Sequence, residues 1–321
     1  MDARALNRTL LLRQGLLERR DDGVDATASR LLALQAQWAP SPYVALWSRL
    51  ASVDKNEVTA LVKATTLRTT VHVQTHAWYP RLASAWIESR RGRTENRGYD
   101  VAALRQAMPK RPLERGEAEA IVARVIGTDE RWAVAFALRT LPFVRASVVG
   151  SWPHTKAGLS ELWREPLPDA AESAVLVVHA FVAAYGPVTR DEIERFTAFR
   201  IRQIAPALET LEEQDGRYDV AGAPRATGRE RAPVRFLPAF DSMLLAHLYN
   251  GRVLAPEHVD AVYNRKNAMC KSTFLVDGYV AGIWRVERER LVVEPFAPLS
   301  PKARREVDAE GARLLEWWLD G

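Results

Sequence analysis

Two glutamines, Gln35 and Gln37, stand on either side of one alanine in an otherwise apolar stretch of the chain. Amide groups can orient a water molecule and stabilise positive charge that develops during a reaction. The pair lies in a predicted helix, where residues two apart point to nearly opposite sides. Because Pro40 should end this helix close by, Gln37 is expected in an unwound turn, where both amides can converge on one point. The alternative is that each side chain caps a backbone group at the helix end.

The sequence lacks the motifs of several other chemistries. It contains no Gly-rich phosphate loop, no Gly-x-Ser-x-Gly elbow and no His-Glu-x-x-His helix. Its six histidines are scattered. His72 and His76 have the spacing of a helical metal pair, but a strand-to-helix boundary is expected between them. The one cysteine, Cys270, permits no internal disulfide and no cysteine-based metal cage. We therefore expect neither a metal nor a cofactor.

The elements that must position the glutamines fall in residues 1–95, the first predicted unit. In order, they are helices beginning near Leu6, Asp25 and Asp54, a strand-like run over 65–74, and a helix over 76–90. Pro40 and Pro42 should end the second helix. Asp54 and Glu57 form a plausible capping pair for the third. Helices followed by a strand pair are the order of a winged helix, so the first unit is predicted to be one.

Two more winged-helix units are predicted, over residues 96–170 and 171–235. The first contains predicted helices over 100–108 and 114–126 and a β-like stretch over 143–149. The second contains an apolar helix over 174–184, a short helix opened by the capping box of Thr189 and Glu192, a helix carrying Ile204, Leu208 and Leu211, and a hairpin starting near Gly216. The basic stretch 223–232 is predicted to be the tip of this hairpin, the wing.

Residues 236–321 are predicted to form a separate C-terminal domain. The sequence predicts strands over 273–276, 279–286 and 291–296 and a last helix over 302–318. Asp277 and Gly278 are a strong hairpin-turn signal. The predicted fold class is therefore α+β, with about three tandem winged-helix motifs and a C-terminal mixed, β-rich or barrel-like domain.

Four segments, taken in order, carry a resemblance to a known family. They are Leu34-Gln35-Ala36-Gln37, Trp47-Ser48-Arg49-Leu50, Leu67-Arg68-Thr69-Thr70-Val71-His72 and Leu237-Pro238-Ala239-Phe240-Asp241. The first resembles the Gln-x-Gln motif of the AlkZ/YcaQ-like winged-helix DNA glycosylases, and the others look like further segments of that family. The third stands in place of its Arg-Gly-Thr-Leu-His strand, with Thr69 where the family has glycine.

The resemblance implies a monofunctional DNA glycosylase that removes bulky N7-alkylguanine adducts or unhooks interstrand crosslinks. Its expected partner is double-stranded DNA that carries alkylated guanine, and its expected role is resistance to a DNA-alkylating natural product. Alkylation at N7 makes guanine cationic and already a good leaving group, so strong acid catalysis is unnecessary. Gln35 and Gln37 are then the expected catalytic residues, which hold and polarise the attacking water.

Four further side chains are candidates for active-site support. With strand alternation, His72 and Gln74 share one face. The alternative is that they form a half-exposed polar strand face. Trp38 and Tyr43, beside the glutamines, could contact a distorted base, although core packing is the alternative role for Trp38.

The formal net charge of +5, carried mainly by arginine, mildly favours a nucleic-acid partner. The predicted DNA-binding residues are Arg68, Arg90, Arg91, Arg93, Arg225, Arg229, Arg231 and Arg235. Phosphate contacts would make DNA binding strongly salt-dependent. The alternative is that the basic loops are simply solvated.

The main competing interpretation is a winged-helix transcription regulator without catalysis. A helix that reads the major groove usually presents basic or amide side chains. The third helix of the clearest winged helix is instead expected to carry Glu209, Glu212 and Glu213, whose charges would repel DNA. A catalytically silent family member that only holds damaged DNA or a drug is a third possibility. No apolar run is long enough to span a bilayer, so we expect a cytoplasmic protein that is not bound to a membrane. No heptad repeat or obvious apolar patch argues for an oligomer, so we expect a monomer.

Overall fold

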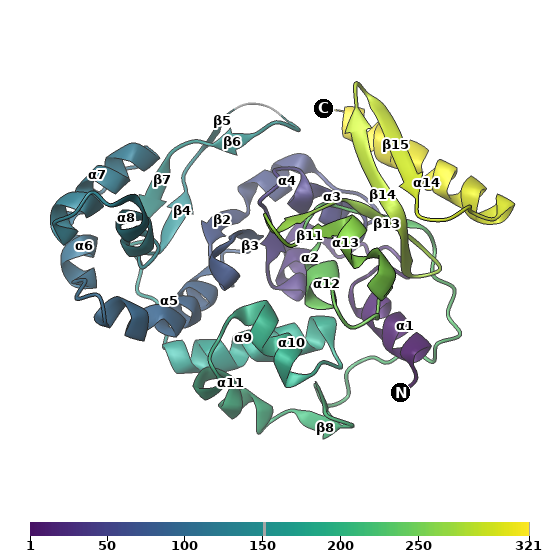
Figure 1. Cartoon of the computed structure of the whole chain (residues 1–321), viewed down its shortest axis with the longest axis horizontal. Coiled ribbons are helices and arrows are strands. Elements are labelled where there is room, and N and C mark those ends of the chain that lie inside the picture. The colour runs from purple at the N-terminus through teal and green to yellow at the C-terminus, as the bar shows by residue number, and fades with distance from the viewer. Residues whose placement is uncertain (150–151, 321) are drawn as a thin grey trace.

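The computed structural model describes residues 1–149 and 152–320 of the chain. The elements form a broad arch, in which α6, α7 and α8 make a lobe at the left of Figure 1. These three helices span Val101–Ala107, Arg115–Ile126 and Arg131–Leu138. Helices alternate with antiparallel sheets along the chain, so the predicted α+β class is confirmed.

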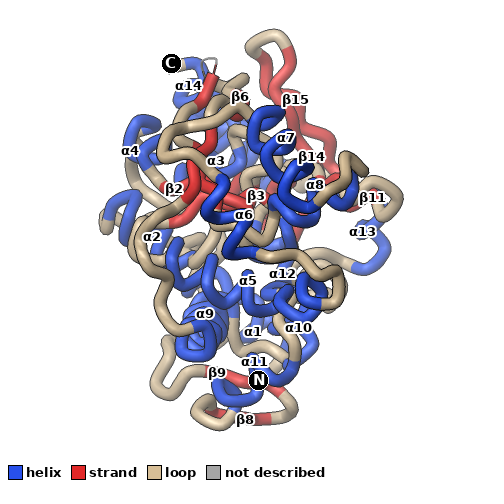
Figure 2. Tube along the Cα trace, turned by 90° about the vertical axis from the view of Figure 1, so that its left-hand side faces the viewer, coloured by secondary structure: helices blue, strands red, loops and turns tan. Residues whose placement is uncertain are grey.

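A five-stranded antiparallel sheet connects this lobe to the rest of the protein. Its strand order is β1-β3-β2-β4-β7. The strands span Leu34–Gln35, Val71–Gln74, Val62–Thr65, Phe143–Arg145 and Ser160–Leu162. Gln35 lies opposite His72, and His72 lies opposite Ala64 on the next strand. The sheet, near the centre of Figure 2, thus brings together residues that are far apart in sequence.

Gln35 lies on strand β1 and Gln37 in the bend that follows it, so the helix predicted over this segment is wrong. Helix α2 (Gly23–Leu31) ends at Leu32, whose φ of 69° takes the backbone out of the helical path. Strand β1 follows and pairs with β3. Pro40 and Pro42 do not end a helix. Pro42 lies in the first turn of α3 (Ser41–Trp47), where the missing N–H of proline leaves no helical hydrogen bond unmade.

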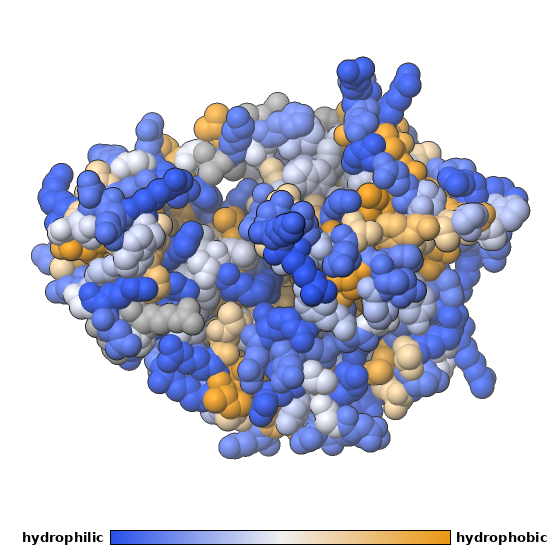
Figure 3. All heavy atoms as spheres, in the orientation of Figure 1, coloured by the Kyte–Doolittle hydropathy of each residue, from blue (hydrophilic) through white to orange (hydrophobic). Residues whose placement is uncertain are grey.

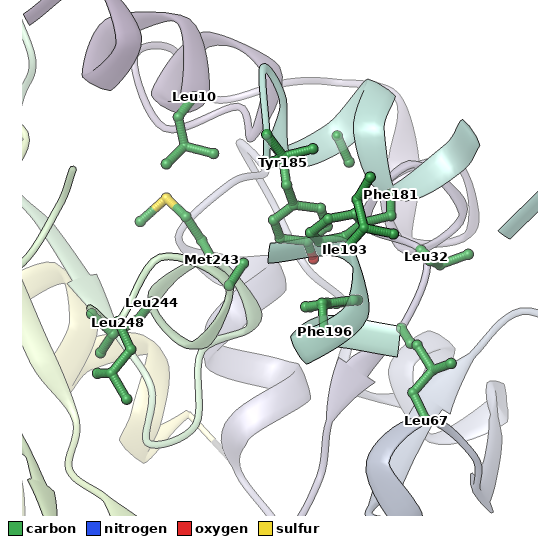
Figure 4. Close-up of a cluster of buried hydrophobic side chains, with 14 of the residues drawn as sticks. Leu10, Leu32, Leu67, Phe181, Tyr185, Ile193, Phe196, Met243, Leu244 and Leu248 are labelled. Carbon is green, nitrogen blue, oxygen red and sulfur yellow. The ribbon is translucent and has the colours of Figure 1, made fainter. Parts of the chain in front are cut away.

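The largest buried core surrounds helices α9, α10 and α11. These helices and their neighbours α1 and α12 span Ala170–Tyr185, Arg190–Thr197, Ile201–Leu208, Ala3–Arg13 and Ser242–Ala246. In Figure 4, Leu10 and Leu32 of the N-terminal segment lie around the aromatic rings of this core. Phe181 stacks on Phe196 with ring centroids 4.3 Å apart and on Tyr185 at 4.9 Å. The N-terminal segment is therefore packed on the third predicted unit.

Three local sequence signals are confirmed. Thr189 and Glu192 form the predicted capping box at the start of α10. Asp54 caps α4 (Lys55–Ala60) by accepting a hydrogen bond from the backbone N–H of Asn56, although the described residues show no reciprocal bond from Glu57, the other member of the predicted pair. The turn at Asp277 joins two strands of the C-terminal sheet. Each signal acts over only a few residues, which is why it can be recognised without knowledge of the fold.

The wing of the third unit differs from its prediction. The hairpin strands β8 and β9 span Glu212–Gln214 and Arg217–Asp219. Its turn is at Asp215 and Gly216, both with positive φ, and not at the predicted tip 223–232. That basic stretch lies on helix α1 instead, where Nε of Arg8 donates to the carbonyl oxygen of Glu230 at 2.8 Å. The stretch is irregular because its backbone groups bond to α1 rather than to a partner strand.

The C-terminal region contains a four-stranded antiparallel sheet in the order β10-β13-β14-β15. Its strands span Arg235–Leu237, Thr273–Val276, Tyr279–Glu287 and Arg290–Pro295, and helix α14 (Pro301–Leu319) follows them. The strand order is that of an open sheet, so the barrel-like closure is not confirmed.

Shorter elements and one long helix complete the fold. They are α5 (Tyr79–Glu95), β5 (Val148–Val149), β6 (Lys156–Ala157), η2 (Pro256–His258), α13 (Val259–Val262), β11 (Tyr263–Asn264), β12 (Met269–Cys270) and the 3-10 turn η1 (Leu67–Thr69). None of the helices in the described ranges combines the length and apolar character that crossing a membrane requires.

Candidate active site around Gln35 and Gln37

The two glutamines meet through their side chains. Gln35 is buried on β1, and Gln37 is exposed two residues further along the chain. The strand pairing continues between them, because the N–H of Ala36 donates to the carbonyl oxygen of Val71 at 2.8 Å. Alternate residues of an extended chain share a face, and Nε2 of Gln35 donates to Oε1 of Gln37. The predicted convergence is confirmed, but it occurs where strand β1 runs into a bend at Gln37 and not at an unwound helix end.

Arg68 lies on the other side of Gln35. Its Nη2 donates to Oε1 of Gln35 at 2.8 Å, and its Nη1 donates to the carbonyl oxygen of Phe196. The guanidinium also lies 4.6 Å from the centre of the Phe196 ring. Within the described ranges Arg68 forms no ion pair with a carboxylate. Burial lowers the pKa of Arg68 to about 10, so the side chain remains a cation at neutral pH.

His72 and Gln74 form a fully buried polar row on β3. Both are 0% exposed, so the half-exposed strand face considered for them is wrong. Oγ1 of Thr66 lies 3.3 Å from Nδ1 of His72 and donates to Oε1 of Gln74 at 3.1 Å. Burial, and then the nearby charge of Arg68, hold the pKa of His72 well below its usual range. His72 is therefore neutral at pH 7 and stands next to Gln35 across the strand pair.

Trp38 and Tyr43 belong to an aromatic cluster rather than to the amide pair. The Trp38 ring stacks on Trp318 at 5.9 Å and meets Trp284 edge-on at 6.3 Å. The Tyr43 ring lies 5.0 Å from that of Trp152. Trp38 thus fits the packing role, because its contacts hold the glutamine segment against the C-terminal region.

The sequence matches the family described as "DNA glycosylase AlkZ-like" over residues 28–317. The chain belongs to the AlkZ-like DNA glycosylase family. The family resemblance predicted from the four ordered segments is confirmed.

Two relatives extend this result. The interstrand DNA cross-link repair glycosylase of Streptomyces sahachiroi is 28% identical over 163 residues, which are 46% of this chain and 43% of that protein. The match thus spans less than half the length of that relative. The solved structure of Streptomyces sahachiroi DNA glycosylase AlkZ has a TM-score of 0.78 and 21% identity, and the match covers 98% of this chain and 97% of that chain. The two proteins therefore share a fold.

In this AlkZ-like chain, three of the arginines predicted to bind DNA lie near the end of α5: Arg90, Arg91 and Arg93. The guanidinium of Arg90 lies 4.8 Å from the centre of the Phe136 ring. Arg91 is exposed and pairs with Glu88 at 2.7 Å. The side chain of Arg93 lies outside the described residues. A role in DNA binding stays a prediction for all three.

The four arginines predicted in the wing are mostly paired with acids. The pairs are Arg225 with Asp219 at 3.0 Å, Arg231 with Glu306 at 2.7 Å and Arg235 with Glu310 at 3.7 Å. Burial lowers the pKa of Arg235 to about 10. Arg229 is exposed and, in the part of the chain that the structure describes, has no ion pair. Among these four, Arg229 is the side chain best placed to reach a phosphate.

Sequence reasoning missed two neighbouring cations, Lys63 and Arg145. Because Ala64 lies opposite Val144 in the antiparallel pair of β2 and β4, Lys63 and Arg145 are direct cross-strand neighbours. Both line a cavity of about 170 Å³ that also touches Tyr43. Neither has a carboxylate partner within the described ranges, and burial followed by repulsion from Arg145 lowers the pKa of Lys63. No local signal could have joined them, because their pairing depends on the sheet.

A metal centre has no visible support in the described ranges. These residues contain no group of three or more histidines, cysteines, aspartates or glutamates that could hold an ion. Cys270 is buried, and burial raises the pKa of its thiol to about 12, so it is not a thiolate nucleophile at neutral pH. The chemistry that the site can offer is that of amides, a neutral imidazole and a guanidinium.

Proposed function

We propose that this chain hydrolyses the N-glycosidic bond of bulky N7-alkylguanine in double-stranded DNA, including guanines joined in interstrand crosslinks. The observation that carries the proposal is the hydrogen-bonded pair of Gln35 and Gln37, with Gln37 exposed at the surface. Family membership supplies the glycosylase class. The name of the Streptomyces sahachiroi relative supports crosslinks as substrates.

Amides suffice for this reaction because of the leaving group. A guanine alkylated at N7 is a cation and departs as a neutral base, so no strong acid has to protonate it. The site must hold a water near C1′ and stabilise the positive charge that develops on the sugar, and amide oxygens can do both. Among the described residues, the hydrogen-bond partners of the Gln35 side chain are Gln37 and Arg68, and neither is a lysine amine. This supports hydrolysis by water without a covalent Schiff-base step, which is monofunctional activity.

The DNA is proposed to lie across the hollowed face of the molecule. Figure 3 shows this face recessed between the lobe of α6–α8 and the rest of the protein. Within that lobe three helices precede the strands β4 and β7, and α9–α11 precede the hairpin of β8 and β9. This order supports the proposal that residues 96–170 and 171–235, together with 1–95, are winged-helix units. A cytoplasmic monomer that serves resistance to an alkylating natural product remains part of the proposal.

The experiment is base release from a duplex that carries one N7-alkylguanine adduct or crosslink. Abasic products are converted to strand breaks by alkali and counted under single-turnover conditions. Gln35→Ala and Gln37→Ala should each slow release by on the order of 100-fold, as loss of one stabilising amide does elsewhere. The matched control is Gln106→Ala, an exposed glutamine on α6, which should release base at the wild-type rate. Wild-type rates in both active-site variants would sink the proposal. Sequence-selective binding of undamaged DNA without base release would favour the regulator instead.

A further inference from the structure

Three polar side chains form one directed chain of hydrogen bonds. Nη2 of Arg68 donates to Oε1 of Gln35 at 2.8 Å, and Nε2 of Gln35 donates to Oε1 of Gln37. A guanidinium can only donate, so it requires the oxygen of the Gln35 amide to face it. The Gln35 nitrogen must then face Gln37. Arg68 thereby decides the orientation of an amide that could otherwise be flipped by 180°.

In this orientation the two glutamines differ in how readily they can form a further hydrogen bond to a water molecule. Gln35 is buried, and both ends of its amide already have partners. Gln37 is exposed, and its oxygen accepts from Gln35 through one of its two lone pairs. In the described residues, the second lone pair and the amide N–H groups of Gln37 have no hydrogen-bond partner. Because Gln37 is exposed and Gln35 is buried, a water from solvent can reach the pair at Gln37.

Arg68 is itself fixed for this task. Its Nη1 donates to the carbonyl oxygen of Phe196, and its guanidinium lies 4.6 Å from the centre of that ring. Its backbone has a φ of 55°, in the left-handed region, which aims the side chain back toward β1. It forms no ion pair with any described carboxylate, so its charge is not neutralised nearby. A hydrogen bond from a charged donor is about twice as strong as a neutral one and polarises the bonds that follow it.

We propose that Arg68 is a positioning residue that orients the amide of Gln35, and through it the amide of Gln37, and that Gln37 alone holds the attacking water. This inference rests on the proposed glycosylase function. It assigns Arg68 a role different from the DNA-phosphate contact expected from the sequence. It also divides between the two glutamines a role that was expected of both equally.

The first test separates the rate of base release from DNA affinity. Arg68→Met should lower the single-turnover rate at saturating protein roughly 10- to 100-fold, the loss expected for a charged hydrogen bond. The dissociation constant and its salt dependence, followed by fluorescence anisotropy, should stay at the wild-type values. Arg68→Lys keeps one donor within reach and should restore part of the rate. Arg285→Met, at an exposed arginine that is paired with Glu287 and Glu294 and is not among the predicted DNA-binding residues, is the matched control and should change neither quantity.

A double variant tests whether Arg68 acts through the glutamines. Arg68→Met should slow Gln37→Ala no further, because the residue that it orients is already gone. If the rate losses of Arg68→Met and Gln37→Ala multiply in the double variant, the inference is overturned. It is also overturned by an Arg68→Met protein with a normal saturated rate, weakened DNA binding and a salt slope reduced by about one, which is the behaviour of a phosphate ligand.

A third measurement is independent of activity. In protein labelled with ¹⁵N at glutamine side chains, the buried Gln35 amide should exchange slowly with solvent, and Arg68→Met should abolish that protection. Resonances are assigned with Gln35→Ala and Gln37→Ala. Unchanged protection in Arg68→Met would overturn the positioning role. A wild-type protein that releases no base contradicts the proposed function, whereas the amide spectra decide on Arg68 in either case.

Discussion

At the scale of single residues, the turn that carries Arg68 is strained. Thr69 follows with a φ of 64°, in the left-handed region that glycine adopts readily and β-branched residues avoid. The family resemblance places glycine at this position. Thr69 thus has a backbone conformation that glycine would adopt with less strain. Oγ1 of Thr69 offers one compensation, because it accepts a hydrogen bond from Arg90 at 3.2 Å.

Thr69→Gly should therefore stabilise the protein. Relief of left-handed strain at a β-branched residue exceeds the extra entropy that glycine loses on folding, and we expect a gain of about 1 kcal/mol in the free energy of unfolding. Urea denaturation measures it. Thr70→Gly is the matched control: Thr70 has an extended φ of −106°, so glycine should only destabilise there. A loss of stability in Thr69→Gly would show that the Arg90 contact outweighs the strain.

At the scale of elements, the sequence revealed local signals and missed non-local pairings. The capping box at Thr189 and Glu192 was recognised because its two partners are three residues apart. The strand at Leu34–Gln35 was misread as helix, because an apolar run this short fits either structure. Its conformation is decided by pairing with β3, which begins at Val71. The pair of Gln35 and Gln37 was predicted from residue type and spacing. The contact between Gln35 and Arg68 could not be predicted, because it depends on the pairing of β1 with β3.

Lys63 and Arg145 give a prediction that belongs to the pairing of β2 and β4. Like charges directly opposite each other on neighbouring strands destabilise a sheet, unless an anion lies between them. Lys63→Met and Arg145→Met should each weaken DNA binding and reduce the salt slope by about 0.9, the value for one lost phosphate contact. Neither should lower the melting temperature, because repulsion is removed as well.

The control for these variants is a cation that already has acidic partners. Arg285 lies on the inner strand β14 of the C-terminal sheet, is exposed and pairs with Glu287 and Glu294. Arg285→Met should leave the affinity for DNA and its salt dependence unchanged. Equal effects of all three substitutions would mean that only the net charge matters, and would contradict a specific phosphate contact at Lys63 and Arg145.

At the scale of the whole molecule, a buried ion pair joins the glutamine region to the C-terminal region. Arg49 and Asp241 are 1% and 0% exposed at their side chains and form two hydrogen bonds of 3.0 and 3.1 Å. Nη2 of Arg49 also donates to Oε1 of Gln14. Both residues lie in segments that carried the family resemblance, in the right order. The sequence could show that both segments are present, but only the fold shows that they meet.

Breaking this pair on one side should destabilise the whole protein. Asp241→Asn keeps an acceptor for the backbone N–H of Met243 at the start of α12, so its effect reports the lost charge. We expect a cost of about 3–5 kcal/mol in the free energy of unfolding, because Arg49 is left as an uncompensated buried cation. Arg49→Met together with Asp241→Leu should cost less than the sum of the two single changes, since neither charge is then buried alone. Urea denaturation of the wild type, Arg49→Met, Asp241→Leu and the double variant measures this coupling. Strictly additive losses in the free energy of unfolding would show that Arg49 and Asp241 stabilise the fold independently of each other.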